Sequence, residues 1–334
     1  MPSDSSNSYQ IDFLAIGDIV IDAFIRLKDA RVHCNVDNES CELCVRFGDK
    51  VPFESVDVIN AVGNSPNASV SASRLGLSSA VSCVVGDDTN GKACIEALEK
   101  NGVSTKFVEI DPRYPTNYHY VLWYDVERTI LVKHAPFDRH MPKNVSPKWI
   151  YLSSLGENTE AFHHEIASWL KEHPETKLAF QPGTFQMKLG TEKLADIYKL
   201  TDIFFCNFEE AQRILKTEEH DKKKLMDSLR ALGPKMVVMT DGMNGAYFSD
   251  GTKYLFMGVY PHTPFERTGA GDAFSSTFTC AIALGKSIEE ALRWAPINSM
   301  SVVQQIGAQR GLLTREKLEE YLAKAPAEYQ PKEI

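Results

Sequence analysis

The sequence predicts an α/β protein with a mostly parallel central sheet and helices on both of its faces. From residue 149 onward, short apolar segments alternate with longer amphipathic ones, which is typical of the strand–helix units that build a parallel sheet. Several apolar segments, such as 178–181 and 202–206, end directly before proline, glycine or asparagine. Ligands of such sheets gather at the carboxyl ends of the strands, so we expect the functional residues there.

Length and composition favour one large domain. The chain has 334 residues, 43% of them hydrophobic, and we expect residues 11–330 to form a single domain behind a disordered tail at 1–10. The net charge of −9 argues against nucleic acid or an anionic membrane as a partner. No apolar run reaches the roughly 18 residues of a membrane span, and the first ten residues lack signal-peptide features. Seven cysteines are few for this length, which predicts reduced thiols and a cytoplasmic location.

The first predicted strand, 11–16, is apolar and ends at Gly17 and Asp18. A buried strand of this kind delivers the side chains that follow it to a site at its carboxyl end. Asp22 lies there, and its position alone fits a loop residue or a helix cap about as well as a residue of that site. We expect Asp18 to be structural.

Residues 24–60 and 112–135 do not follow the strand–helix alternation and are expected to form a small β-sheet lid. In the predicted strand 118–124, a period of two separates the residues into two faces. One face carries Tyr118, Tyr120, Leu122 and Tyr124, and the other carries His119, Val121 and Trp123. Both faces are rich in aromatic rings, which suits a sheet that covers a ligand on one side and a partner on the other.

The lid segment also contains His33, Cys34, Cys41 and Cys44. Cys41 and Cys44 have the spacing of a zinc knuckle, and His33 or Cys34 would complete a tetrahedral set. A single cysteine pair without a second pair is equally found in a strand with ordinary thiols, and we adopt that interpretation.

The segment 61–69 predicts a helix start, with Ser65 as N-cap and Pro66 at the first helical position. Gly63, Asn64 and Asn67 would then face whatever lies at the helix N-terminus. Amide side chains suit the recognition of hydroxyls because they both donate and accept hydrogen bonds. A role in packing alone is the other interpretation.

Asn207 and Glu210 follow a predicted strand and form an Asn-x-x-Glu sequence at a helix start. This spacing is that of a capping box, but it also places an amide and a carboxylate on one side of one turn. Thr240, Gly242 and Gly245 end the next strand and by themselves predict an ordinary turn.

The segment Thr268-Gly269-Ala270-Gly271-Asp272 precedes an apolar helix at 273–284. The glycines let the backbone approach a ligand, and the amides of a helix start favour an anion. A carboxylate beside a phosphate is electrostatically costly, and abstraction of a proton from an attacking hydroxyl would explain Asp272. A glycine turn with an acidic residue near the cap is the alternative.

This segment resembles the anion-hole signature of the ribokinase/phosphofructokinase-B family of sugar kinases, Asp-Thr-x-Gly-Ala-Gly-Asp, with Glu266 and Arg267 as departures. Gly63 and Asn67 are similarly placed to the family signature Gly-Gly-x-x-x-Asn, in which Val62 replaces the first glycine. The resemblance runs from about residue 12 to 313. It implies a ribokinase-like fold whose lid covers the substrate and often forms a homodimer contact.

The resemblance implies an ATP-dependent kinase that phosphorylates a hydroxymethyl group of a fructose- or ribose-like sugar. Asp272 is then the general base, and the amides of Gly269, Ala270 and Gly271 stabilise the charge on the transferred group. The implied acceptor ligands are Asp22, Gly63, Asn64 and Asn67. The implied ATP ligands are Asn207, Thr240, Gly242, Gly245, Thr268, Asn298 and Gly307. Asn207 and Glu210 are implied to hold Mg²⁺ through water, and a monovalent cation is compatible with the position of Glu266.

The acceptor itself stays open at this point. A nucleoside would stack on the aromatic strand 118–124, and a sugar phosphate would pair with the cationic side chains of the lid. A free sugar needs neither, and we adopt it because the side chains suited to hydroxyls are the clearer signal. A catalytically silent ligand-binding or assembly protein on the same fold is the alternative of another class, which Val62, Glu266 and Arg267 favour.

Overall fold

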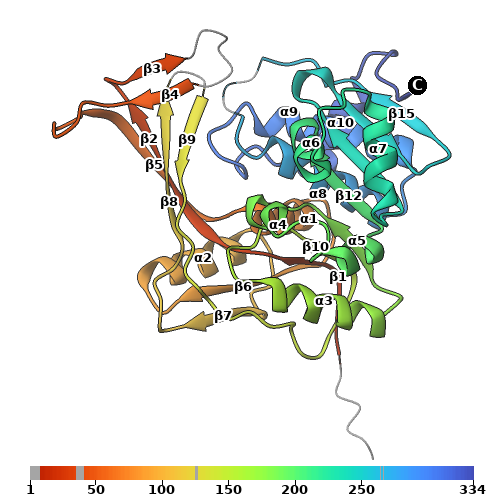
Figure 1. Cartoon of the computed structure of the whole chain (residues 1–334), viewed down its shortest axis with the longest axis horizontal. Coiled ribbons are helices and arrows are strands. Elements are labelled where there is room, and N and C mark those ends of the chain that lie inside the picture. The colour runs from red at the N-terminus through yellow and green to blue at the C-terminus, as the bar shows by residue number, and fades with distance from the viewer. Residues whose placement is uncertain (1–7, 35–40, 125–126, 264, 266) are drawn as a thin grey trace, which may run out of the picture.

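The computed structural model describes residues 8–34, 41–124, 127–263, 265 and 267–334. Its main sheet is ten-stranded, in the order β16-β15-β14-β13-β12-β11-β10-β1-β6-β7 (Figure 1). The strands from β13 to β7 are parallel, and β14 to β16 add an antiparallel edge. The bounds are β1 Tyr9–Ile16, β6 Ser79–Gly86, β7 Val108–Asp111, β10 Val145–Leu152, β11 Lys177–Phe180, β12 Ile203–Asn207, β13 Met236–Thr240, β14 Ala246–Ser249, β15 Tyr254–Met257 and β16 Lys332–Glu333.

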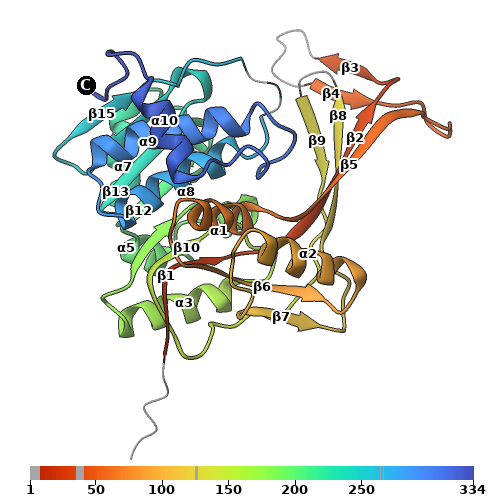
Figure 2. The same cartoon turned by 180° about the vertical axis from the view of Figure 1, so that it is seen from behind.

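Helices cover both faces of this sheet, and the two helical layers can be followed from opposite sides in Figure 1 and Figure 2. Phe13 and Ala15 of β1 belong to the core under α1, α2, α8 and α9, whereas Leu14 and Ile16 belong to the core under α3, α5, α6 and α7. The predicted α/β architecture is therefore confirmed. The bounds are α1 Asn64–Arg74, α2 Thr89–Lys100, α3 Glu160–Glu172, α4 Thr184–Leu189, α5 Ala195–Leu200, α6 Phe208–Leu215, α7 Lys222–Ala231, α8 Ala270–Ala283, α9 Ile288–Val302 and α10 Arg315–Ala323.

A separate four-stranded sheet of order β5-β2-β8-β9 extends away from the main body (Figure 1). Its strands are β2 Val20–Leu27, β5 Phe53–Val62, β8 Tyr118–Tyr124 and β9 Glu127–Leu131. They come from the segments predicted to form the lid, although the sheet already begins at Val20, directly after the turn that ends β1. We call this four-stranded sheet the lid. Within the described ranges, every helix is too short or too polar to span a bilayer.

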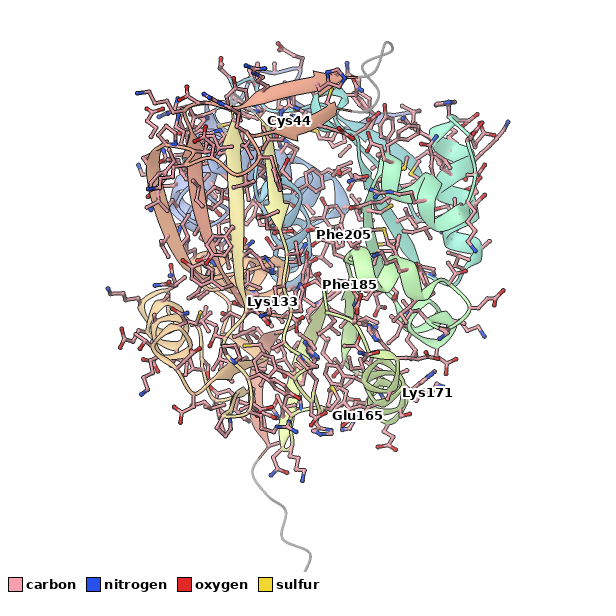
Figure 3. All side chains as sticks on the ribbon, turned by 60° about the vertical axis from the view of Figure 1, so that its left-hand side comes forward. Cys44, Lys133, Glu165, Lys171, Phe185 and Phe205 are labelled. Atoms are coloured by element: carbon pink, nitrogen blue, oxygen red, sulfur yellow. A yellow bond between two sulfur atoms is a disulfide. The ribbon has the colours of Figure 1, made fainter. Side chains whose placement is uncertain are left out.

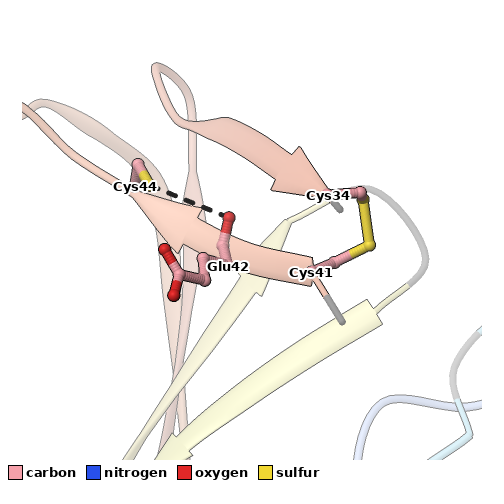
Figure 4. Close-up of a disulfide and its surroundings, with 4 residues drawn as sticks. All are labelled: Cys34, Cys41, Glu42 and Cys44. Carbon is pink, nitrogen blue, oxygen red and sulfur yellow. Dashed lines mark hydrogen bonds between the residues drawn. A yellow bond between two sulfur atoms is a disulfide. The ribbon is translucent and has the colours of Figure 1, made fainter. Parts of the chain in front are cut away.

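A hairpin of β3 (Arg31–Cys34) and β4 (Cys41–Cys44) lies at the far end of the lid. Cys34 and Cys41 are joined by a disulfide (Figure 4). Both sulfurs are therefore unavailable as zinc thiolates, so the interpretation that Cys34 and Cys41 bind zinc is wrong. The expectation that all cysteines are reduced thiols is also wrong for these two residues. The described residues contain no group of three His, Cys, Asp or Glu side chains placed to hold a metal.

The lid is anchored to the body through Asp18, which lies in the turn between β1 and β2. Its Oδ1 accepts from Arg139 Nε at 2.8 Å and Nη2 at 2.6 Å, and its Oδ2 accepts from the Gly156 amide at 2.8 Å and lies 2.9 Å from His134 Nδ1. Burial raises the pKa of Asp18, but the hydrogen bond with His134 and the charge of Arg139 outweigh it, so the pKa lies below the ordinary value. Asp18 is thus a buried, fully paired carboxylate that fixes the base of the lid.

Replacing Arg139 by methionine should destabilise the fold, because it leaves a buried carboxylate short of its main counter-charge. We expect Arg139→Met to lower the free energy of unfolding by about 3 kcal/mol at pH 7, measured by urea denaturation. A carboxylate with a lowered pKa stabilises the fold above its unfolded pKa of about 3.9 and loses that contribution as the pH falls, so the difference between variant and wild type should narrow below about pH 4.

Arg113→Met is the matched control. Arg113 also pairs with two carboxylates, Asp111 and Asp138, but its side chain is 56% exposed, so the change should destabilise the fold clearly less than Arg139→Met does. Equal losses in the two variants would contradict the anchoring role of Arg139.

Candidate active site

A cavity of about 510 Å³ lies where the carboxyl ends of the strands meet the lid. Figure 3 shows Phe185 and Phe205, two of its lining residues, between the lid strands and the helical body. A second cavity of about 390 Å³ adjoins it. The two cavities share Asn207, Thr240, Arg267, Ala270, Gly271 and Phe274.

The start of α8 forms the boundary between the two cavities. Gly269 caps this helix with φ 79°, and a Cβ atom at this position would lie 2.3 Å from Ala308 Cβ. Only glycine therefore allows the chain to enter the helix so close to the neighbouring turn. The first turn of a helix leaves its N–H groups without intrahelical partners, so this boundary is suited to an anion. Thr268 and Gly269 line the first cavity, and Ala270 and Gly271 line both.

Asp272 lies in that first turn and accepts hydrogen bonds from three amide side chains. Asn64 Nδ2 donates to Oδ1 at 2.8 Å, Asn67 Nδ2 donates to Oδ2 at 2.8 Å, and Gln181 Nε2 donates to Oδ1 at 3.2 Å. A carboxylate offers about four acceptor positions, so one remains for another donor once the contacts of the described residues are counted. Asn64 and Asn67, predicted as acceptor ligands, thus hold the carboxylate that was predicted as general base.

Further residues orient these amides. Gln309 Nε2 donates to Asn67 Oδ1 at 2.9 Å, so the amide nitrogen of Asn67 faces Asp272. Gln181 Oε1 accepts from the Tyr151 hydroxyl and lies 3.1 Å from the Ser275 hydroxyl, which leaves its nitrogen for Asp272. The sequence analysis did not identify Gln181, Gln309 or Tyr151, since no local pattern marks them.

The environment of Asp272 sets its protonation. Burial raises its pKa above the ordinary value, while the hydrogen bonds from Asn67, Gln181 and Asn64 and the positive charge of Arg128 lower it. Burial prevails, so the pKa is raised. Such a group is a stronger base than an exposed aspartate, and the amides limit how far its ionised form is disfavoured.

Asp22 lines the same cavity from β2 of the lid. Its Oδ1 lies 3.5 Å from Nδ1 of His119, the residue directly paired with it on β8. The cavity face of the lid therefore carries His119, while the opposite face carries Tyr120, which is 48% exposed. The tyrosines of β8 face away from the cavity, so the expectation that they stack on an acceptor base is wrong.

Asn207 and Glu210 form a capping box at the start of α6. Asn207 Oδ1 accepts from the Glu210 amide, and Glu210 Oε2 accepts from the Asn207 amide, both at 2.8 Å. Both side chains line the first cavity. Burial raises the pKa of Glu210, and the negative charge of Asp272 adds to this, whereas its hydrogen bond with Asn207 and the charge of Arg213 lower it. Glu210 and Asp272 thus bring two carboxylates to the lining of one cavity, which suits a bound cation.

Of the residues predicted to bind ATP, one group lines the two cavities and the other, Asn298 and Gly307, does not. Thr240, Gly242 and Gly245 line the second cavity, and Thr240 and Thr268 line the first. Asn298 does not reach either cavity, because its side chain is fully buried and bonded to Thr277 Oγ1 at 2.7 Å and to the Leu313 amide at 2.8 Å. Gly307 packs under the lid instead, where a Cβ atom would lie 2.2 Å from Ile59 Cδ1. Glu266 lies outside the described residues.

An α/β sheet with a lid, two adjoining cavities and a helix start beside a partly buried carboxylate suit a phosphotransferase-type site. Residues 37–315 match the pfkB family of carbohydrate kinases, so the chain belongs to that family. It is a phosphotransferase acting on an alcohol group, of the ATP-dependent kind that the family comprises.

Individual relatives agree with this assignment. The chain is 27% identical to the ribokinase of Bacillus subtilis over 272 residues, which covers 78% of this chain and 87% of the relative. It is 24% identical to a nucleoside kinase of Methanothermobacter thermautotrophicus over 255 residues, 75% of this chain and 80% of the relative. The structure of Arabidopsis thaliana ribokinase complexed with ribose and ATP superposes with a TM-score of 0.77 and 19% identity, covering 93% of this chain and 98% of that one. This last likeness shows the shared ribokinase-like fold.

The hydrogen bonds from the amide side chains to Asp272 predict a shift in the pH dependence of activity. A general base must be ionised, so turnover falls as the pH drops through its pKa. Asn64→Ala removes one hydrogen bond to the charged form, worth roughly 1.5–3 kcal/mol, or about one to two pKa units. We expect the acid limb of the profile of kcat/KM against pH to move up by about one unit or more.

Asn90→Ala is the control, because Asn90 also lies in the first turn of a helix, α2, but does not line either cavity. Its profile should match that of the wild type. An acid limb at the same pH in Asn64→Ala would contradict the link between Asn64 and the protonation of Asp272.

Proposed function

We propose that this protein transfers the γ-phosphoryl group of ATP to a hydroxymethyl group of a fructose- or ribose-like sugar. The observation that carries the proposal is the position of Asp272: it lines the first cavity from the helix turn whose Ala270 and Gly271 line both cavities, with one acceptor position left among the described contacts. In this arrangement the acceptor occupies the first cavity and the nucleotide the second.

Asp272 acts as general base in the proposed reaction. Asn64, Asn67 and Gln181 fix its carboxylate so that the remaining acceptor position receives the proton of the acceptor hydroxyl. The hydroxyl oxygen attacks the γ-phosphorus, the proton passes to Asp272, and the bond from that phosphorus to the bridging oxygen breaks, giving a phosphate ester and ADP. The amides of Gly269, Ala270 and Gly271 stabilise the charge on the transferred group.

The remaining ligands are proposed on the same basis. Asp22 and Gly63, which line the first cavity, bind the sugar. Thr240, Gly242, Gly245 and Thr268 surround the phosphates. The second cavity continues along apolar side chains suited to an adenine ring, namely Met257, Val259, Met300 and Val303. Asn298 and Gly307 have no part in this proposal. We also propose a cytoplasmic location, where ATP is available.

Asn207 and Glu210 fit a Mg²⁺ ion, because their oxygen atoms line the same cavity as the Asp272 carboxylate, whose negative charge adds to burial in raising the pKa of Glu210. A bound Mg²⁺ ion would neutralise phosphate charge at this position. Because the Asn207 and Glu210 oxygens already accept backbone hydrogen bonds, contacts through water are favoured.

A nucleoside is the second candidate acceptor. The first cavity has an apolar wall made by Ile130 and Val132 on the lid side and Phe185 of α4 on the other, and the ring of His134 meets that of Phe185 edge to face. A planar base would be accommodated by such a wall. This observation, rather than the tyrosines of β8, supports the nucleoside.

We further propose that the outer face of the lid forms a homodimer contact. Val58, Ala23, Tyr120 and Leu131 lie in one row across the lid, and Val58, Tyr120 and Leu131 are about half exposed. Apolar exposure of this kind suits a partner surface.

We expect a dimer of the wild type in sedimentation velocity. Val58→Lys places a charge in this apolar row and should shift the protein toward monomer. A monomeric wild type would reject the contact.

A panel of acceptors with ATP, read out as ADP formation, tests the proposed function. We expect turnover with D-ribose or D-fructose to exceed the rate without acceptor, and turnover restricted to adenosine or another nucleoside would favour the second candidate. Nucleotide binding without turnover on any acceptor would instead favour a catalytically silent binding protein.

Asp272→Asn tests the general base in the same assay. The amide keeps the size of the side chain but cannot accept the proton, so kcat should fall roughly 100-fold or more while the affinity for ATP is nearly kept. Near-normal turnover in this variant would reject the role of Asp272.

A further inference from the structure

The cavity face of the lid carries an acidic and an imidazole side chain next to each other. Asp22 on β2 and His119 on β8 are paired in the parallel register of the lid, so their side chains lie on the same face. The two side chains are only 13% and 11% exposed, and Asp22 Oδ1 lies 3.5 Å from His119 Nδ1. Both residues line the first cavity.

Each of the two residues keeps an unused polar atom. Among the described residues, neither Asp22 Oδ1 nor His119 Nε2 has a hydrogen-bond partner, and both atoms are buried. Leaving such a buried atom without a hydrogen bond destabilises the fold, so two of them beside one cavity indicate that a bound ligand supplies the missing partners. The 3.5 Å separation of Oδ1 and Nδ1 is too long for a good hydrogen bond between them.

A second buried histidine shows what a purely structural role looks like in this protein. His163 of α3 has partners at both ring nitrogens: Nδ1 lies 2.6 Å from the Thr159 carbonyl oxygen, and Nε2 lies 2.9 Å from the Gln186 amide. It lines neither cavity. His119 differs on both counts, since its Nε2 is unpaired and its ring lies on the cavity wall.

We propose that His119 is a specificity-determining residue that binds the acceptor together with Asp22. A proton on Nδ1 is favoured by the neighbouring Asp22 carboxylate, which leaves Nε2 as a hydrogen-bond acceptor. Asp22 then accepts from one hydroxyl of the acceptor and His119 Nε2 from an adjacent one. The class of acceptor is therefore a sugar or nucleoside with an intact vicinal diol, separate from the hydroxymethyl group that faces Asp272. This inference rests on the proposed kinase function.

Two conservative variants of His119 distinguish a contact made by Nε2 from a contact made by Nδ1. Gln places its terminal amide near the position of Nε2, whereas Asn places it near Nδ1. We expect His119→Asn to raise the KM for the acceptor about 10-fold or more, the value of one hydrogen bond, with kcat and the KM for ATP near wild type. His119→Gln should raise the KM for the acceptor clearly less than His119→Asn does. Circular dichroism and thermal melts of both variants would show that they fold.

The probes are D-ribose with 2-deoxy-D-ribose, and adenosine with 2′-deoxyadenosine. The wild type should prefer the member of each pair that keeps the diol, and His119→Asn should lose most of that preference. His140→Gln is the matched control: His140 is 70% exposed on the body of the protein, and its variant should keep the wild-type preference.

Turnover on one of these acceptors with an unchanged acceptor KM in both His119 variants would overturn the assignment of His119 alone. Equal losses in the Asn and Gln variants would also overturn it, because a contact through Nε2 requires Gln to be the better substitute. Failure of the wild type to phosphorylate any of the four probes, or D-fructose, would reject the proposed function and the assignment with it.

Discussion

The hydrogen bonds that converge on Asp272 constrain the rest of the site. Asn64 and Asn67 come from the start of α1, Gln181 comes from the end of β11, and the acid itself lies in the first turn of α8. These elements meet only if the strand order of the main sheet brings their ends to one edge. The contact therefore ties the α/β architecture to the chemistry, because any shift of α1 or α8 would break the bonds that orient the carboxylate.

Four carboxylates near this cavity have different surroundings and therefore different roles. Asp18 is paired with Arg139 and fixes the lid, and its pKa is lowered. Asp272 and Glu210 are partly buried and line the same cavity, and their pKa values are raised. Asp22 lines the cavity, and its Oδ1 has no hydrogen-bond partner among the described residues. Burial, counter-charge and unused hydrogen-bonding capacity thus distinguish a structural acid, the proposed general base with its proposed cation-binding neighbour, and the acid proposed to bind the acceptor.

The lid shows how one strand serves two surfaces. The alternation of side chains along β8 sends His119 toward the cavity and Tyr120 toward the outside. The inner face also packs on the turn at Gly307 and Ala308, which in turn touches Gly269 at the start of α8. Through these contacts the lid, the first cavity and the start of α8 form one connected structure.

The sequence alone determined the α/β class, the lid segments and the motif from Thr268 to Asp272, because periodicity, turn residues and glycine chemistry act over a few neighbouring residues. The capping box of Asn207 and Glu210 was predictable for the same reason. The tertiary structure decided which face of β8 meets the cavity, that Asn298 is buried away from it, and that Cys34 and Cys41 are joined. It also decided that Asn64, Asn67 and Gln181, which lie 208, 205 and 91 residues from Asp272, bind one carboxylate. Such contacts depend on the order of strands and the packing of helices, for which no local pattern in the chain carries a signal.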